Sequence, residues 1–251
     1  MNLSRTREQH LQELANYLNF LKSIGVSEVP LANQLRQHAL ADNSFQPIPA
    51  QSTMTSKSSR KTSGSPIDLA DVRSELGDCS RCKLSATRKN IVFGSGNPNA
   101  DLVFVGEGPG ADEDEKGLPF IGRAGKKLTE IIEKGMGLNR EKDTYICNIV
   151  KCRPPGNRDP ERDEIEACEP FLVKQLGAIQ PKVIVALGKP ASSTLLGRPV
   201  PITKERGIWQ EFAGIPLMLT FHPSYLIRFY TVENRRAVQD DMKKVLEALK
   251  K

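Results

Sequence analysis

Apolar residues follow three different patterns along the 251-residue chain, and each pattern predicts a different kind of structure. Leucines recur between residues 5 and 25 at the spacing of one helical face. Residues 42–66 are rich in Ser, Thr, Pro and Lys, with too few apolar side chains to offset the entropy of ordering. From about Ile67 onward, short apolar runs alternate with helical stretches. We therefore expect an N-terminal helical extension over residues 1–41, a disordered linker over 42–66 and a folded domain over 67–251.

The folded domain is expected to contain parallel strands connected by helices, because its apolar runs and helical stretches alternate. The expected strands are residues 102–105, 145–150, 183–187 and 217–221. The expected helices are residues 123–135, 161–178, 189–196 and 233 to the end. In open sheets of this kind, ligands bind beyond the carboxyl ends of the strands.

Glycines and polar side chains follow each expected strand at that edge. The segment Gly106–Gly110 follows the first strand, Asn148 lies near the end of the second, Gly188 follows the third and His222 the fourth. Glycines let backbone N–H groups approach a ligand closely, although a Gly-Pro turn is often only a turn. A lone histidine is usually structural, but one before a proline at a strand end is a better catalytic candidate. Neither a dinucleotide-binding fingerprint nor a phosphate-binding loop is present in the sequence.

Composition limits the choice of partners and location. Lys and Arg outnumber Asp and Glu by 36 to 30, which permits a polyanionic partner but does not require one. No apolar run is long enough to span a bilayer, and the first residues lack the apolar core of a secretory signal. We therefore expect a cytoplasmic protein without membrane contact.

Four of the five cysteines have the spacing of a metal site. Cys79 and Cys82 form a C-x-x-C pair, and Cys152 and Cys168 follow downstream. Four thiolates suit zinc or an iron–sulfur cluster, and spacing alone does not choose between them. The alternative is a set of unrelated buried thiols. Cys147 falls inside an apolar run and is interpreted as a core residue.

Four motifs, taken together, resemble those of the type-4 uracil-DNA glycosylases, the iron–sulfur branch of their superfamily. They are GEGPGADEDEKGLPFIGRAG, NIVKCRPPGNRDP, ALG and FHPSY, and the resemblance runs from about Leu69 to the C-terminus. It implies an α/β fold, a three-layer α/β/α sandwich around a four-stranded parallel sheet. It also implies one structural 4Fe-4S cluster, held by Cys79, Cys82, Cys152 and Cys168.

The resemblance further implies a role for each residue of the pocket. Phe120 is expected to stack on a flipped-out uracil, and Asn148 to read its edge through an amide that donates and accepts. His222 is expected to donate to the uracil oxygen that gains charge as the base leaves. The remaining assignments are a water-positioning carboxylate, Glu113, and two residues of the pocket floor, Glu107 and Gly108.

Two positions depart from the best-known branch of the superfamily. Gly108 replaces a water-activating Asp, and Gly110 replaces a Tyr that blocks the methyl group of thymine. A related branch traps its product through a histidine near the segment Ile202–Trp209, which contains none here. The resemblance therefore implies turnover without a trapped product. Basic segments at Arg198–Arg206 and Arg228–Arg236 are candidates for gripping phosphates.

The expected function is hydrolytic excision of uracil from DNA, acting as a monomer on single- and double-stranded substrates. One alternative is a non-catalytic DNA-binding or polymerase-associated module of the same fold. The combination of Asn148 and His222 favours the enzyme, because a pure binder needs neither. Another alternative is an iron–sulfur electron carrier, which would require a second cluster or a flavin motif, and neither is evident in the sequence.

Overall fold

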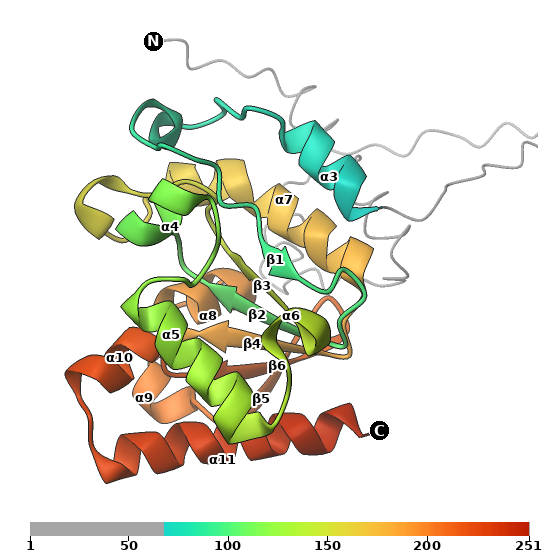
Figure 1. The fold of residues 1–251 in the computed structure, drawn as a ribbon, viewed down its shortest axis with the longest axis vertical. Coiled ribbons are helices and arrows are strands. Elements are labelled where there is room, and N and C mark those ends of the chain that lie inside the picture. The colour runs from blue at the N-terminus through green and yellow to red at the C-terminus, as the bar shows by residue number, and fades with distance from the viewer. Residues whose placement is uncertain (1–67, 251) are drawn as a thin grey trace, which may run out of the picture. The chain divides into compact units, whose positions relative to one another are not determined.

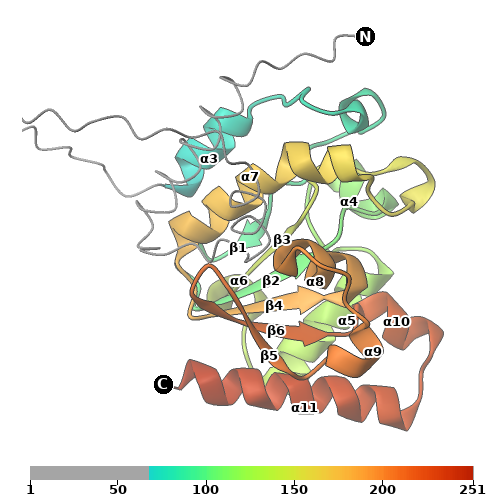
Figure 2. The ribbon, with the colours of Figure 1, turned by 180° about the vertical axis from the view of Figure 1, so that it is seen from behind.

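A computed structural model describes residues 68–250, which form a mixed α/β unit (Figures 1 and 2). The expected helical extension over 1–41 and the expected linker over 42–66 lie outside the described residues. No helix among residues 68–250 combines the length and the apolar character needed to cross a bilayer.

The sheet has six strands in the described part of the chain, in the order β1-β3-β2-β4-β6-β5. The four central strands pair in parallel, and the two short edge strands pair antiparallel to their neighbours. The strands are β1 Ser95–Gly96, β2 Leu102–Gly106, β3 Thr144–Asn148, β4 Val183–Leu187, β5 Trp209–Phe212 and β6 Ile215–Thr220.

The sequence analysis expected a sheet of four strands and therefore missed the two edge strands, β1 and β5. β1 has only two residues, and β5 is half exposed along its length, so neither produces a long apolar run. β5 and β6 form a hairpin around Ala213 and Gly214, which have φ angles of 51° and 82°. Two consecutive positive φ angles are typical of the tight turns that connect antiparallel strands.

Helices cover both faces of the sheet (Figures 1 and 2). Val103 and Val105 of β2 belong to one apolar core, and Leu102 and Phe104 belong to the other. The first core includes residues of α7 Arg162–Ile179 and α8 Gly188–Leu196. The second includes residues of α5 Arg123–Glu130, η2 Ile131–Met136 and α11 Val232–Leu249. Burial on both faces explains why the central strands are continuous apolar runs.

The expected strands and helices are confirmed to within two residues of their bounds. The helix expected at 123–135 is α5 continued by η2, a π-helical segment that ends at Met136 and is capped by Gly137. The sequence did not predict the shorter elements, which lie mainly between the strands and the helices that cover them. These are α3 Leu69–Leu76, η1 Lys83–Ala86, α4 Ala111–Lys116, α6 Arg140–Asp143, η3 Pro155–Asn157, α9 Ile202–Glu205 and α10 Pro223–Arg228.

Candidate active site

A cavity of about 700 Å³ opens at the carboxyl edge of the central strands, which is where ligands bind in sheets of this kind. Its volume falls within the range of small-molecule sites. All six predicted pocket residues line it, namely Glu107, Gly108, Glu113, Phe120, Asn148 and His222. The structure therefore brings together residues that are up to 115 positions apart in the sequence, from 107 to 222.

Asn148 places an unpaired carboxamide oxygen in this pocket. Its side chain is 1% exposed, and Oδ1 has no hydrogen-bond partner among the described residues. Gly106 lies opposite, and a Cβ there would come within 2.4 Å of Oδ1 and 2.5 Å of the Phe120 ring. A buried polar group without a partner costs roughly 1–3 kcal/mol. The amide is therefore available to a ligand that can pair with it.

Phe120 forms a wall of the pocket from an uncommon backbone conformation. Its φ angle is +52°, and its ring lies 5.7 Å from the His222 ring, measured between centroids. Bulky residues rarely adopt a positive φ, so the surrounding structure must hold it. Arg140 does so by donating from Nη2 to the carbonyl of Pro119 at 2.8 Å. The aromatic wall is thus fixed before any ligand binds.

Glu113 connects the glycine-rich loop to the segment that follows Phe120. Its carboxylate accepts backbone N–H groups from Gly110 at 3.1 Å, Ile121 at 2.9 Å and Gly122 at 2.8 Å. An ionised carboxylate has about four acceptor positions, so one remains for a water molecule. The geometry shows that Glu113 positions the loops, and its role in holding water stays a prediction.

Gly125 provides a test of how tightly Phe120 must be held. A Cβ at this position would lie 1.9 Å from the backbone carbonyl of Phe120, so Gly125→Ala must displace that segment. If the reaction that the resemblance implies takes place here, we expect Gly125→Ala to lower its rate at least about tenfold, because small misplacements at a site cost large factors in rate. Gly135→Ala is the matched control, since no atom lies within 4 Å of a Cβ there. Equal rates for the two variants, measured in single turnover with melting curves, would contradict the expectation.

His222 is held as a neutral ring with a defined tautomer. It caps α10, and its Nδ1 accepts the backbone N–H of Ser224 at 3.1 Å. Because that N–H can only donate, Nδ1 is unprotonated and the ring proton lies on Nε2. Burial lowers the pKa of His222 to about 4, and the charge of Arg228 adds to the decrease. His222 is therefore a neutral hydrogen-bond donor at neutral pH.

Glu107 shares the pocket with a carboxylate that the sequence analysis did not assign. Burial raises the pKa of Glu107 to about 7, and the neighbouring Asp159 carboxylate adds to the increase. Asp159 lies in the RPPGNRDP motif, and the charged residues of that motif were the only sequence feature that could have pointed to it. Other lining residues to which the sequence analysis gave no role are Asn157, Arg158, Lys189 and Tyr225.

The four predicted ligand cysteines are free thiols, and donors are directed at the sulfurs of three of them. The Lys151 amide donates to Cys168 at 3.3 Å, Arg88 to Cys152 at 3.6 Å and Arg81 to Cys79 at 3.3 Å. Burial raises the pKa of Cys152 to about 11, and the nearby thiols of Cys168 and Cys82 add to the increase. In residues 68–250, no three His, Cys, Asp or Glu side chains are arranged as the ligands of one metal ion. Cys147 is fully buried in the core, as expected.

Iron–sulfur thiolates commonly accept hydrogen bonds at sulfur from nearby N–H groups, as these sulfurs do. The four cysteine thiols and the N–H groups directed at three of them therefore have the chemical character of a thiolate-bound cluster site. Lys151 also joins the cysteines to the pocket, because its Nζ donates to the carbonyl of Asn148 at 2.6 Å while its amide contacts Cys168.

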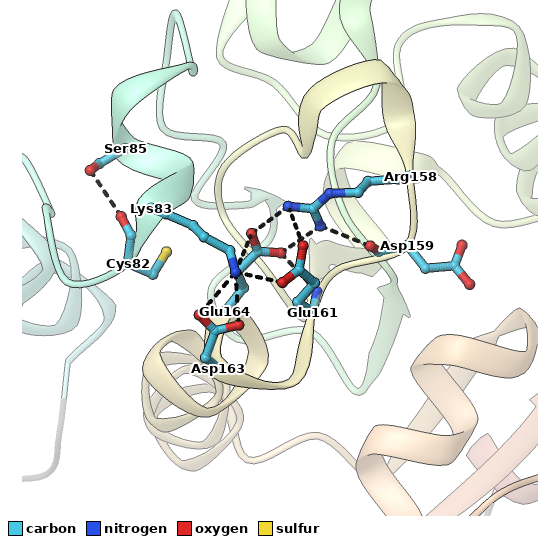
Figure 3. A network of polar contacts seen from close by, with 8 residues as sticks. All are labelled: Cys82, Lys83, Ser85, Arg158, Asp159, Glu161, Asp163 and Glu164. Carbon is cyan, nitrogen blue, oxygen red and sulfur yellow. Dashed lines mark hydrogen bonds and ion pairs between the residues drawn. The ribbon is translucent and has the colours of Figure 1, made fainter. Parts of the chain in front are cut away.

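The cysteine loop, which carries Cys79 and Cys82, is linked by a polar network to the pocket wall at Arg158 (Figure 3). Lys83, next to Cys82, donates to Glu161 at 2.5 Å and pairs with the buried carboxylate of Glu164 at 3.9 Å. Arg158, in the pocket lining, donates to both oxygens of Glu164 at 2.8 and 2.6 Å. The cysteine loop, the start of α7 and the pocket wall therefore form one connected structure.

The basic segment Arg198–Arg206 is largely occupied by internal contacts. Arg198 pairs with Glu205 at 2.6 Å, and Arg206 binds the buried carboxylate of Asp241. Arg228 differs, because it is exposed and lines the cavity. Of the two segments proposed to grip phosphates, the one beginning at Arg228 is therefore better placed.

The carboxyl edge of this α/β sheet thus holds an aromatic wall, an unpaired amide and a neutral histidine, a set of groups that suits a planar polar ring. Comparison with known proteins gives the family. Residues 93–250 match the family model described as the uracil DNA glycosylase superfamily. The chain belongs to this superfamily, within its type-4 uracil-DNA glycosylases.

Three relatives carry the name type-4 uracil-DNA glycosylase. The protein of Thermotoga maritima is 48% identical over 187 residues, covering 73% of this chain and 96% of the relative. The protein of Saccharolobus solfataricus is 43% identical over 191 residues, covering 73% and 86%. The protein of Sulfurisphaera tokodaii is 42% identical over 187 residues, covering 71% and 84%.

Proposed function

We propose that this chain is a uracil-DNA glycosylase of DNA repair, which hydrolyses the N-glycosidic bond of deoxyuridine and leaves an abasic site. The carrying observation is the buried amide of Asn148, whose oxygen has no partner among the described residues and which faces the pocket beside Phe120. Uracil offers a donor at N3 and an acceptor at O4, and a neutral amide can satisfy both. The polymerase-associated binding module is not favoured, because binding alone does not need this constellation.

The reaction requires the nucleotide to leave the base stack, since an enzyme cannot reach the glycosidic bond inside it. In the proposed complex, Phe120 stacks on the uracil ring and the backbone of Glu107 and Gly108 forms the floor. As the bond breaks, negative charge develops on the uracil O2 and positive charge on the sugar. The Nε2–H of His222 donates a hydrogen bond to O2. The neutral ring already carries this proton, so His222 does not have to be protonated by solvent before it can donate.

Water attack on the sugar requires a group that holds the water. We assign this to the free acceptor position of Glu113, because Gly108 offers no carboxylate. The Glu113 carboxylate also offsets the positive charge of the sugar, as carboxylates do in sugar hydrolysis. Its three amide contacts keep the carboxylate in place.

We further propose that Cys79, Cys82, Cys152 and Cys168 hold one 4Fe-4S cluster. The donors directed at three of their sulfurs support this assignment. When bound, the cluster supplies iron–thiolate bonds that cross-link the segment at Cys79 to the segment at Cys152 and to α7. Two sets of contacts connect these cross-linked segments to the pocket. Lys151 contacts both Cys168 and Asn148, and Glu164 contacts both Lys83 and Arg158. We expect the protein to act as a monomer on single- and double-stranded DNA in the cytoplasm.

The function is tested by incubating the pure full-length protein with uracil-containing single- and double-stranded oligonucleotides, followed by alkaline cleavage. Strand breaks at the uracil position, absent from a matched thymine oligonucleotide, are the expected result. Binding of the uracil oligonucleotide without any base release would instead favour the non-catalytic module.

The pH dependence of the reaction should report Glu107. Below about pH 7 its carboxyl is neutral, and above it a negative charge appears near the departing uracil anion. We therefore expect the single-turnover rate to fall as pH rises through about 7. Lys189 lines the same cavity, and its positive charge is expected to reduce this loss but not to remove it. Glu107→Gln should abolish this decrease.

Asp159→Asn is the second variant, and it should move the decrease to lower pH, because Asp159 contributes to the raised pKa of Glu107. The measurement is a pH–rate profile for the wild type and both variants on one substrate. A profile of Glu107→Gln that retains the wild-type decrease would assign it to another group.

The cluster is tested by iron and acid-labile sulfide analysis of anaerobically purified protein. We expect each to approach about four per chain, with broad absorbance in the near-visible range. Cys152→Ser should lose both, whereas Cys147→Ser, a buried thiol of the core, should keep them. Zinc without sulfide in the wild type would replace the cluster assignment by a zinc site.

A further inference from the structure

A buried ion pair outside the pocket joins three segments of the chain. Asp241 of α11 is fully buried, and its Oδ2 accepts from the Thr220 hydroxyl at 2.7 Å and from Arg206 Nε at 2.9 Å. The other carboxylate oxygen pairs with Arg206 Nη2, which also donates to the carbonyl of Ala237. The three segments are the end of α9, the end of β6 and the middle of α11. The proposed reaction mechanism uses none of these side chains.

The ion pair anchors the end of β6 that leads into the active site. Thr220 is the last residue of β6, and the next two residues, Phe221 and His222, both line the cavity. The guanidinium carbon of Arg206 also lies 5.7 Å from the centroid of the Phe221 ring. The same arginine therefore contacts the carboxylate that holds β6 and one wall of the pocket.

Two glycines show how closely the backbone is fitted around this anchor. Gly207 has a φ of +74°, and a Cβ there would lie 2.5 Å from Asp241 Oδ1. A Cβ on Gly188, at the end of β4, would lie 2.8 Å from the Cβ of His222. Close-packed interiors transmit small displacements instead of absorbing them. A shift of Thr220 is therefore expected to reach His222, two residues away.

Stability alone does not account for the buried charge, because an ion pair in the interior adds little over apolar side chains of the same volume. Burial raises the pKa of Asp241, and the contacts with Arg206 and Thr220 oppose that increase. What the pair supplies is direction, since a guanidinium that donates to both carboxylate oxygens fixes their position. It also occupies Arg206, which the sequence analysis considered as a phosphate contact.

We propose that the Arg206–Asp241 ion pair, acting through Thr220, positions His222 for uracil release. Asp241 holds the Thr220 hydroxyl and Arg206 holds Asp241, so the end of β6 has one position. The Nε2–H of His222 then lies where the uracil O2 gains charge, and a preorganised donor loses much of its effect when it is displaced. This inference rests on the proposed function, because it takes His222 as the donor to uracil. The three residues act as positioning residues without touching the DNA.

The test is a double-mutant cycle between Thr220→Val and His222→Phe, measured as single-turnover rates with saturating uracil oligonucleotide. Thr220→Val removes the hydroxyl that Asp241 binds, so we expect the rate to fall about tenfold while DNA affinity is unchanged. In the His222→Phe background the same change should cost less than about twofold, because the donor that it positions is already absent. Thr220→Ser keeps the hydroxyl and should retain most of the wild-type rate.

Thr144→Val is the matched control. Thr144 is also a fully buried strand threonine, and its hydroxyl donates at 2.7 Å to the carbonyl of Arg140 at the amino end of β3. Its removal should cost similar stability in melting curves, but any loss of rate should be the same with and without His222→Phe. Arg206→Lys is a second variant for the cycle, because it keeps the charge but not the paired contacts to Asp241. Its loss of rate should also depend on His222.

A second measurement does not depend on uracil release. The chain has three histidines, and only His222 lies within residues 68–250, so NMR of protein with labelled histidine can follow its ring nitrogens. Thr220→Val should shift or broaden the His222 signals, and Thr144→Val should leave them in place. Unchanged signals in Thr220→Val would overturn the proposal, as would a rate loss that persists in full in the His222→Phe background.

The role of Arg206 has its own contrary outcome. A salt-dependent loss of DNA affinity in Arg206→Lys, without a change in the single-turnover rate, would make Arg206 a phosphate contact and overturn its positioning role. Failure of the proposed function is distinguishable from these outcomes, because the wild type would then release no uracil while the His222 signals still respond to Thr220→Val.

Discussion

His222→Phe is expected to lower the single-turnover rate of uracil release by about 10²–10³-fold, the usual loss when one preorganised donor to a developing anion is removed. Phenylalanine keeps a flat ring beside Phe120, whose centroid lies 5.7 Å from that of His222, so the shape of the pocket is largely retained. What is lost is the Nε2–H, which the Ser224 amide fixes by occupying Nδ1. The effect should therefore fall on the rate constant for chemistry and much less on DNA affinity.

Ser224→Ala is the control for this prediction. It removes the hydroxyl 2.7 Å from Nδ1 but keeps the backbone N–H that defines the tautomer, so it should lose far less activity. The pH profile adds a second check, because a ring with a pKa of about 4 is already neutral near pH 6.5. A rate that requires protonation of His222 near pH 6.5 would show that it acts as a cation, against the neutral-donor mechanism.

Asn148→Asp is expected to reduce uracil release at least about a hundredfold, which corresponds to roughly 2.7 kcal/mol in the barrier. The wild-type amide oxygen has no partner among residues 68–250, and the amide as a whole can accept from N3–H and donate to O4. An ionised Asp only accepts, so O4 stays unpaired at a cost of about 1–3 kcal/mol. It also places a negative charge beside the uracil anion that forms in the transition state, which adds to the loss.

Asn157→Asp provides the matched change at the rim of the same cavity. Asn157 is exposed, and its Oδ1 accepts from Arg153 Nε at 2.7 Å, a contact that Asp can keep. The assay is single-turnover cleavage of uracil and cytosine oligonucleotides, with the visible absorbance of each variant as a check of the fold. If Asn148→Asp released uracil as fast as Asn157→Asp, Asn148 would not be the base reader and the pocket would be misplaced.

The sequence alone determined the central architecture of the described domain. The apolar runs at Leu102–Gly106 and Val183–Leu187 are recognisable because a strand buried on both faces has no polar alternation. The position of Asn148 and His222 at strand ends followed from the same pattern, since parallel strands bring their carboxyl ends to one edge. These features depend on how apolar and polar residues alternate within a short segment, and that alternation can be read directly from the sequence.

Only the tertiary structure decided how the site residues are held and charged. The three amides on Glu113, the positive φ of Phe120 and the Nε2 tautomer of His222 arise from contacts that no local pattern encodes. Lys83 and Glu161 are 78 positions apart, and Glu107 meets Asp159 only because two loops converge. Burial and the approach of a second charge set these pKa values and pairings, and both are properties of the assembled fold. The same holds for the edge strands β1 and β5, whose partners rather than their own residues make them strands.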